Sequence, residues 1–278
     1  MTLSEDDSAL RRAVLNRLPT SLYRYSSLEG ERKDWIKRLI IKSQLYFVRP
    51  SSFNDPLDCR IPVNYDGISP LKARARWRRK FKEQFPHEDS RSIKGRVDEL
   101  LNSLRSEKGR DKQNEVIYKS IDGNGIASFS SEPFGMLMWS YYANGHKGIA
   151  VRFRMTLENL VKIAPLNLPV EVKYSHDMPE ISYYEIDSDR HNFLSTILGT
   201  KSKAWEHESE WRLITVNHLG YVQLPPSMID GVILGIRIED EDKNDVLKWV
   251  KERGDRLEVF QMIHKRGSFD LEMVPLTY

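Results

Sequence analysis

The segment that most constrains the fold is GHKGIAVRFRM, at residues 145–155. Ile149, Val151 and Phe153 stand at alternate positions in it, with small or charged residues between them. Because strand residues two apart face the same side, this alternation predicts a strand with one buried face. Eight other segments have strand-forming composition, and helical segments do not alternate regularly with them, so we expect an α+β fold with a largely antiparallel sheet. They are residues 21–27, 44–49, 125–131, 171–175, 221–224, 231–238, 256–264 and 270–276.

Residues 69–119 differ from this pattern, because they are rich in charged, helix-forming residues with sparse apolar positions. We expect two or three helices there, forming an insertion or lid within a single domain over residues 1–278. A chain of this length can bury one sizeable core. It contains neither a G-x-G-x-x-G dinucleotide motif nor a P-loop, so a nucleotide would bind by other means.

The cysteine and hydropathy patterns predict a cytoplasmic protein that does not enter a membrane. Cys59 is the single cysteine, which excludes an internal disulfide and suits a reducing compartment. No segment approaches the roughly 20 apolar residues that cross a bilayer. The thiolate sets of structural zinc sites and the H-E-x-x-H motif are missing, so no metal is expected. The oligomeric state stays open.

A basic stretch, LKARARWRRKFK, occupies residues 71–82. It could follow a phosphate backbone while its aromatic residues pack or stack on bases. It could equally be a helix with a solvated basic face, whose Trp77 and Phe81 are buried against the body of the protein. The candidate nucleic-acid-binding residues are Arg74, Arg76, Arg78 and Arg79.

The segment WEHESEWRLI, at residues 205–214, is the strongest candidate site. In an extended conformation Glu208, Glu210 and Arg212 would project from one face. Glu210 could simply pair with Arg212 or a cross-strand base, or it could present a carboxylate to a sugar or a developing positive charge. Two acids on one face repel, so at least one would need a donor or a raised pKa.

Three further segments carry polar side chains whose role the sequence leaves open. Arg24 could clamp a phosphate or lie in solvent on an edge strand. Asp55, next to Pro56, suits an Asx turn, although Asp55 and Asp58 could be catalytic carboxylates. His146, in a segment rich in aromatic and hydroxyl residues, could be a general base or a turn histidine.

Several blocks carry a family resemblance, in order, from about Leu22 to Ile214. They are LYRY, LYF-x-x-P-x-SFNDPLDC, SFS, LMWSYYANGHKG and KSKAWEHESEWRLI. They resemble the bacterial domain-of-unknown-function family 2971 (DUF2971). The order of an early-strand Arg, a Ser-aromatic-Ser strand and Glu-x-Glu is also similar to ADP-ribosyltransferases of the Arg-Ser-Glu class.

The second resemblance implies a split antiparallel sheet and NAD as a substrate, without a metal. It implies that Glu210 stabilises an oxocarbenium-like ribose, that Glu208 deprotonates the acceptor, and that Ser130 orients Glu210 or the ribose. Arg24 would hold the pyrophosphate. The implied NAD-binding residues are Arg24, Tyr25, Ser128, Trp139, Tyr141 and His146, with Trp139 or Tyr141 stacked on nicotinamide.

The function implied is an NAD-dependent ADP-ribosyltransferase, such as a bacterial toxin or anti-phage defence effector, acting on nucleic acid or protein. Two alternatives remain beside it. One is a non-catalytic module that senses a nucleotide or nucleic acid. The other is a metal-independent nuclease using Asp55, Asp58 and His146.

Overall fold

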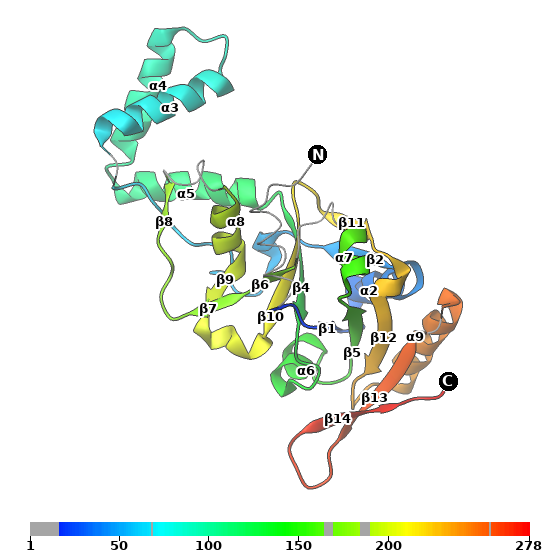
Figure 1. Ribbon diagram of the computed structural model, residues 1–278. Helices are drawn as coiled ribbons and strands as arrows, with labels where there is room; N and C mark the ends of the chain where they lie inside the picture. The colour runs from blue at the N-terminus through cyan, green and yellow to red at the C-terminus, as the bar shows by residue number, and fades with distance from the viewer. Residues whose placement is uncertain (1–16, 68, 164–168, 184–189, 256) are drawn as a thin grey trace. The chain divides into compact units, whose positions relative to one another are not determined.

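The computed structural model describes residues 17–67, 69–163, 169–183, 190–255 and 257–278 (Figure 1). The chain divides into two compact units. Unit 1 comprises residues 1–52, 123–176 and 201–278, and unit 2 comprises residues 53–122 and 177–200. The prediction of a single domain with an insertion at residues 69–119 stays a prediction.

Unit 1 is built on a mostly antiparallel sheet, which confirms the α+β prediction. Among the described residues the sheet has eight strands in the order β14-β13-β12-β5-β1-β4-β10-β6, with β12 and β13 parallel. The strands are β1 (Ser21–Ser26), β4 (Gly125–Ser130), β5 (Ile149–Arg154), β6 (Val170–Glu171), β10 (Glu210–Thr215), β12 (Ile229–Leu234), β13 (Glu258–His264) and β14 (Leu271–Pro275).

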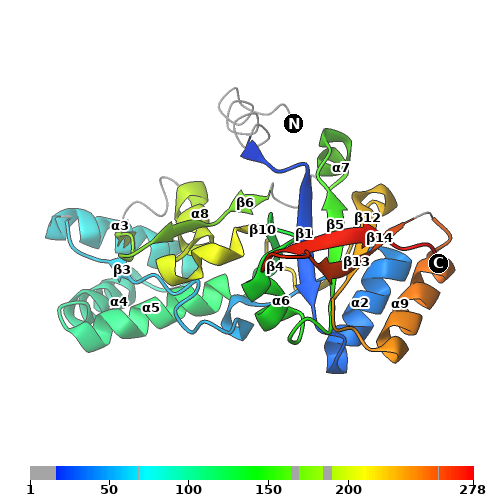
Figure 2. The same cartoon turned by 90° about the horizontal axis from the view of Figure 1, so that it is seen from below.

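Helices cover both faces of this sheet. Helices α2 (Gly30–Lys42) and α9 (Asp240–Arg253) lie side by side (Figures 1 and 2) and share a core with Val151 and Phe153 of β5. Helix α6 (Met136–Tyr142) packs on the other face, where its Trp139 contacts the core around Tyr25 and Ala150. The expected half-buried pattern of β5 is therefore wrong at Ala150, which is fully buried because β5 lies in the middle of the sheet.

Smaller elements complete unit 1. Strand β2 (Gln44–Phe47) pairs with β11 (Gly220–Gln223), and β7 (Lys173–Ser175) pairs with β9 (Thr200–Ser202). The short helices are α7 (Leu157–Lys162), η1 (Pro50–Ser52), η3 (Lys203–Glu208) and η4 (Pro226–Met228). No helix in the described part of the chain is both long and apolar enough to cross a membrane.

Gly148, at the start of β5, offers a test of this packing. A methyl group at this position would lie 2.1 Å from the carbonyl oxygen of Ser26. We therefore expect Gly148→Ala to lower the free energy of unfolding by about 2–3 kcal/mol, as overpacking does. The measurement is chemical denaturation.

Gly95 in helix α4 is the matched control, because a methyl group there meets no atom within 4 Å. Gly95→Ala should stabilise its helix by about 0.5–1 kcal/mol. Equal effects of the two substitutions would contradict the close approach at Gly148.

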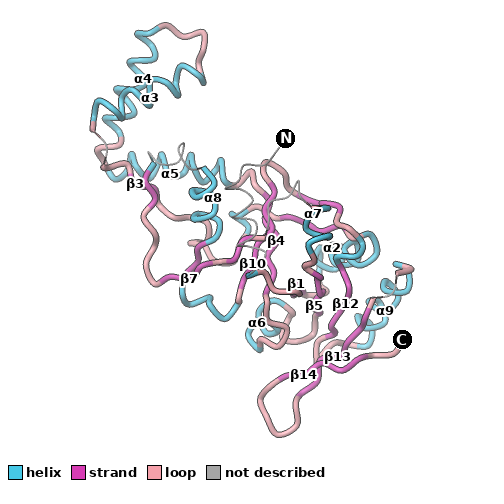
Figure 3. Tube along the Cα trace, in the orientation of Figure 1, coloured by secondary structure: helices cyan, strands magenta, loops and turns pink. Residues whose placement is uncertain are grey.

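Unit 2 is mainly helical (Figure 3). Its helices are α3 (Pro70–Gln84), α4 (Ser90–Ser103), α5 (Glu107–Ile121) and α8 (Arg190–Gly199), and its strands β3 (Val63–Asn64) and β8 (Ile181–Ser182) pair in parallel. Side-chain oxygens of Ser69, Asp89 and Ser106 cap the first three helices, as Ser and Asp commonly do. Helices α3 to α5 thus occupy the range expected to be helical.

Candidate active site

The segment before β10 is not a continuous strand. Residues Lys203–Glu208 form the 3₁₀ helix η3, and Ser209 then adopts a left-handed conformation with φ 45°. The prediction that Glu208 lies on the same strand as Glu210 and Arg212 is therefore wrong, since only the latter two belong to β10. The turn at Ser209 nevertheless brings Glu208 back toward Glu210.

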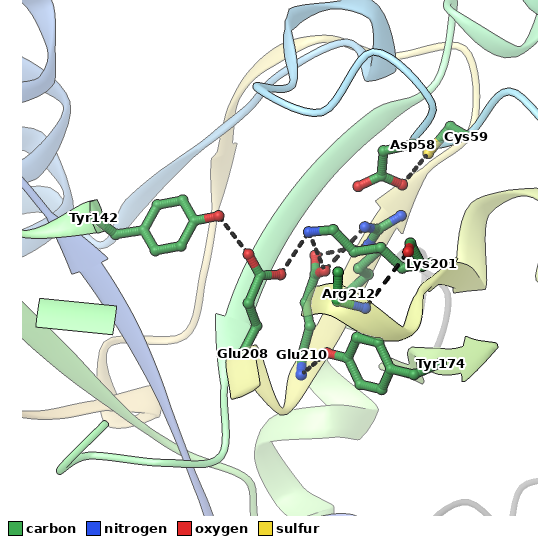
Figure 4. A network of polar contacts seen from close by, with 10 residues as sticks. Asp58, Cys59, Tyr142, Tyr174, Lys201, Glu208, Glu210 and Arg212 are labelled. Carbon is green, nitrogen blue, oxygen red and sulfur yellow. Dashed lines mark hydrogen bonds and ion pairs between the residues drawn. The ribbon is translucent and has the colours of Figure 1, made fainter. Parts of the chain in front are cut away.

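Four buried charged side chains meet at this turn and form what we call the carboxylate cluster: Lys201, Glu208, Glu210 and Arg212 (Figure 4). Lys201 Nζ lies 2.5 Å from Glu208 Oε2 and 3.3 Å from Glu210 Oε2. Arg212 donates twice to Glu210, from Nε to Oε1 at 2.7 Å and from Nη2 to Oε2 at 2.9 Å. The exposed fractions are 7% for Lys201, 3% for Glu208, 5% for Glu210 and 0% for Arg212.

Hydroxyl groups complete the surroundings of the cluster. Tyr142 of α6 donates a hydrogen bond to Glu208 Oε1, and Ser128 of β4 donates to Glu210. Tyr174 accepts from the backbone N–H of Glu210 at 2.8 Å. The ring of Trp205 lies 5.0 Å from Lys201 Nζ and shields it. Each charged side chain of the cluster therefore has an oppositely charged partner within it.

The same environment moves the two acids in opposite directions. Burial, opposed by Lys201, raises the pKa of Glu208. Burial alone would also raise the pKa of Glu210, but Arg212 and Lys201 outweigh it and lower that pKa to about 2. Two neighbouring acids were expected to need a hydrogen-bond donor or a raised pKa. Glu210 has the donor, Arg212, and Glu208 has the raised pKa.

The pKa of Glu210 predicts a pH dependence. A carboxyl whose folded-state pKa lies below its ordinary value of 4.5 contributes stability above that pH, and the contribution is lost as the pH falls toward about 2. We expect the difference in free energy of unfolding between the wild type and Glu210→Gln to shrink over this range.

Chemical denaturation at a series of pH values checks this dependence, with Glu206→Gln as the control. Glu206 lies in the neighbouring helix η3, four residues before Glu210, but its side chain is 55% exposed. A difference between wild type and Glu210→Gln that stays constant from pH 4.5 downward would contradict the assignment.

The structure separates Arg24 from the cluster. Ser130 pairs with Tyr23 on one side and with Glu210 on the other, so these three side chains share a face of the sheet. Arg24 follows Tyr23 and points to the opposite face, where it donates from Nη1 to the carbonyl oxygen of Ser128 at 3.1 Å. Burial, together with Arg32, lowers the pKa of Arg24 to about 10. Arg24 was expected to hold the pyrophosphate of the NAD on which Glu210 acts, but the two side chains lie on opposite faces of the sheet.

The serine of β4 that contacts Glu210 is not the one that was expected. Ser130 is fully buried, and its Oγ accepts from the backbone N–H of Glu132 at 3.0 Å. Ser128, rather than Ser130, provides the hydroxyl that contacts Glu210.

Two of the expected NAD-binding aromatics belong to the core. Trp139 is fully buried, donates to the carbonyl oxygen of Pro133 at 2.9 Å, and meets Tyr25 edge-on at 5.1 Å. Tyr25 donates to the carbonyl oxygen of Glu132, and burial raises its pKa. Tyr141 is different, because it is 61% exposed and lies 6.1 Å from the ring of His207. Trp139 therefore cannot stack on nicotinamide without leaving the core, whereas Tyr141 is accessible.

His146 lies in the tight turn that follows α6. It has a positive φ of 69°, stacks on Trp139 at 6.3 Å, and its Nε2 lies 3.2 Å from Ser140 Oγ. Burial, aided by Arg237, lowers its pKa. These contacts fit the turn-histidine interpretation.

The acids at residues 52–59, in unit 2, form a structural turn. Asp55 Oδ1 accepts from the backbone N–H of Leu57 at 2.9 Å, which is the predicted Asx turn. Asp58 is buried and accepts from the thiol of Cys59.

The four arginines expected to bind nucleic acid divide into two groups. Arg76 donates to the carbonyl oxygen of Tyr183 at 3.2 Å and lies 5.4 Å from its ring. Trp77 is buried in the same place, stacked on Tyr183 at 4.7 Å, so it does not stack on bases. The other three, Arg74, Arg78 and Arg79, line a groove between α3 and α4.

Sequence reasoning missed several members of the site. No role in the site was predicted for Lys201, Tyr142 or Tyr174, although the first two fall within the blocks KSKAWEHESEWRLI and LMWSYYANGHKG that carried the family resemblance. No spacing rule could link Tyr142 to Glu208, because the two are 66 residues apart. Among the described residues no group of His, Cys, Asp or Glu is arranged to hold a metal ion.

The fold and the site together define an α+β protein whose antiparallel sheet carries a buried cluster of two glutamates, a lysine and an arginine at the start of β10. Residues 138–213 match the family model described as "Protein of unknown function (DUF2971)". The match confirms the predicted DUF2971 resemblance, and Tyr142, Lys201 and the other members of the carboxylate cluster all lie within it. No curated protein and no solved structure matches the chain.

Proposed function

We propose that the carboxylate cluster is the catalytic site of an NAD-dependent ADP-ribosyltransferase. The observation that carries the proposal is geometric: Lys201 Nζ holds Glu208 at 2.5 Å and Glu210 at 3.3 Å in one buried network. Within it the pKa values of the two carboxyls are shifted in opposite directions. Such a separation allows one carboxyl to exchange a proton while its neighbour stays ionised. Transfer from a ribosyl donor needs both roles.

The proposed reaction breaks the bond between ribose C1′ and the nicotinamide nitrogen, and the bonding electron pair leaves with nicotinamide. The sugar then carries positive charge, as in glycoside cleavage, and ionised Glu210 faces it. An acceptor N–H or O–H attacks C1′, and its proton passes to Glu208. The raised pKa of Glu208 makes it the better base of the two.

Two further features support this assignment. Strands β1 and β4 pair at one position in the described chain, Tyr23 with Ser130, which suits a sheet that divides there. Ser128 holds Glu210 from the strand that carries the Ser-aromatic-Ser sequence. The pyrophosphate contact expected from Arg24 is not part of the proposal, because Arg24 lies on the other face.

Access to the cluster requires a movement between α6 and η3. Tyr142 covers Glu208 from α6, and the neighbouring Tyr141 meets His207 of η3. Separation of these two elements would expose Glu208 and leave the ring of Tyr141 beside the opening. Tyr141 is then the aromatic side chain proposed to contact nicotinamide.

The second candidate function is a non-catalytic module that senses a nucleotide or nucleic acid. The observation that favours it is the charge balance of the cluster, in which Lys201 and Arg212 offset both carboxylates and all four groups are buried. The nuclease alternative has less support, because Asp55 is occupied in a turn and His146 is stacked on Trp139.

The experiment uses the purified full chain with NAD labelled on nicotinamide or, separately, on adenosine, together with bacterial nucleic acid or protein. Release of nicotinamide with transfer of the adenosine label supports the transferase. Calorimetric NAD binding without release would favour the sensor, and absence of both would contradict the proposal.

A further inference from the structure

Helices α3 and α4 of unit 2 lie next to each other (Figure 1). The groove between them has a volume of about 870 Å³ and is lined by residues of these two helices alone. The lining residues are Leu71, Arg74, Ala75, Arg78, Arg79, Lys82, Glu83, Ser90, Lys94 and Val97. Five of them are basic and one is acidic, whereas the whole chain carries a net charge of +3.

We propose that this groove binds the sugar–phosphate backbone of a single-stranded nucleic acid. Arg74, Arg78 and Lys82 follow one another at intervals of four residues, so α3 presents a row of cations about 6 Å apart. Lys94 faces the same groove from α4. A nucleic-acid strand carries one phosphate per about 3.4 Å when stacked, which is dense enough to meet every cation of the row.

Acidic side chains neutralise only some of the basic residues that line the groove between α3 and α4. Arg74 pairs with Asp98, and Arg79 lies 4.0 Å from Glu83. Within the described chain no acidic side chain pairs with Arg78, Lys82 or Lys94. All three are exposed. A polyanion can therefore reach them without breaking an internal ion pair.

The lining also favours a nucleic acid over other anionic partners. The arginine forks match two phosphate oxygens at once. A membrane surface would require an apolar face that inserts into lipid, but Ala73 and Trp77 of α3 are buried within unit 2. A concave groove between two helices suits a single strand better than a rigid duplex.

The groove holds no aromatic side chain, because Trp77 and Phe81 stack on the other side of α3, where Trp77 meets Tyr183. Base stacking therefore contributes nothing here, and binding is expected to be independent of base sequence and strongly dependent on salt. This inference rests on α3 and α4 and does not depend on the chemistry of the carboxylate cluster.

The test measures binding of a labelled single-stranded oligonucleotide to the full chain at several salt concentrations. Replacing Arg78, Lys82 and Lys94 together by glutamine is expected to lower the slope of log affinity against log salt by about 2, since each phosphate contact to a single strand contributes about 0.7. The matched control replaces Lys108, Lys112 and Lys119 of α5 by glutamine, which removes equal charge from exposed positions outside the groove.

The triple variant could lose affinity for the oligonucleotide because it misfolds, so a second variant that should bind more tightly is also measured. Glu83→Gln removes the acidic residue of the groove and its ion pair with Arg79, so it should tighten binding and steepen the slope by up to about 0.7. Equal effects of the two triple variants, or no effect of Glu83→Gln, would overturn the proposal. So would a duplex, an acidic peptide or an anionic vesicle that competes as well as the single strand.

Discussion

Replacing Glu210 by glutamine is expected to lower the free energy of unfolding by about 3–5 kcal/mol, because it removes one partner of a buried ion pair. Arg212 is fully buried and gives two hydrogen bonds to Glu210. Glutamine offers one acceptor oxygen in place of two and carries no charge, so the buried guanidinium of Arg212 loses its bidentate carboxylate partner. The measurement is chemical denaturation at neutral pH.

The control is Glu206→Gln, which makes the same chemical change four residues earlier. Glu206 pairs with Lys203 on the surface, and exposed pairs contribute about 0–1 kcal/mol. The expected difference between the two variants is therefore large. Equal destabilisation by the two variants would contradict the prediction that the buried ion pair of Glu210 and Arg212 stabilises the fold more than the exposed pair does.

Replacing Glu208 by glutamine is expected to lower activity strongly and to lower stability less than Glu210→Gln does. Burial raises the pKa of Glu208, so the folded protein already tolerates its neutral form better than water does. We expect a smaller loss of stability than for Glu210→Gln, because Lys201, the ion-pair partner of Glu208, also contacts Glu210. If Glu208 accepts the acceptor's proton, nicotinamide release and transfer should fall by about 10²–10⁴-fold.

This contrast makes Glu208→Gln the sharper probe of the proposed chemistry, since loss of activity in Glu210→Gln could follow from unfolding alone. Glu206→Gln should keep full activity. Unchanged transfer by Glu208→Gln, in a reaction that the wild type catalyses, would remove Glu208 from the mechanism.

Tyr142→Phe tests the positioning of Glu208. The hydroxyl of Tyr142 donates to Glu208 and lowers its pKa, opposing the effect of burial. Without it the pKa of Glu208 should rise further, so the acidic limb of the pH–rate profile should move to higher pH. A purely structural role of Tyr142 would reduce the rate without moving that limb.

Most of the sheet could be predicted from the sequence because strand alternation is a local property. The pattern around Ile149, Val151 and Phe153 depends only on neighbours two positions apart. The same rule failed at Glu208, since the 3₁₀ helix η3 and the left-handed Ser209 interrupt the expected strand. Backbone conformation at a single non-glycine residue has no reliable sequence signal.

The composition of the site was harder to predict than its position. The Glu-x-Glu segment indicated where charged side chains would gather. Arg24 was assigned to the wrong face of the sheet, because the sequence of β1 does not show which of its two faces lies on the side of the site. Its pairing with β4 and β5 decides the matter, placing Tyr23 rather than Arg24 beside Ser130. Register depends on partner strands that are distant in sequence.

The sequence alone determined the fold class, the helical character of residues 69–119 and the places where charge is concentrated, because periodicity and composition act over a few residues. The tertiary structure alone decided which of these charges are neutralised. Lys201 reaches both glutamates, and Tyr183 holds Arg76 away from the groove that Arg78 lines. Ion pairing and burial depend on distances between groups far apart in the chain, and only folding sets those distances.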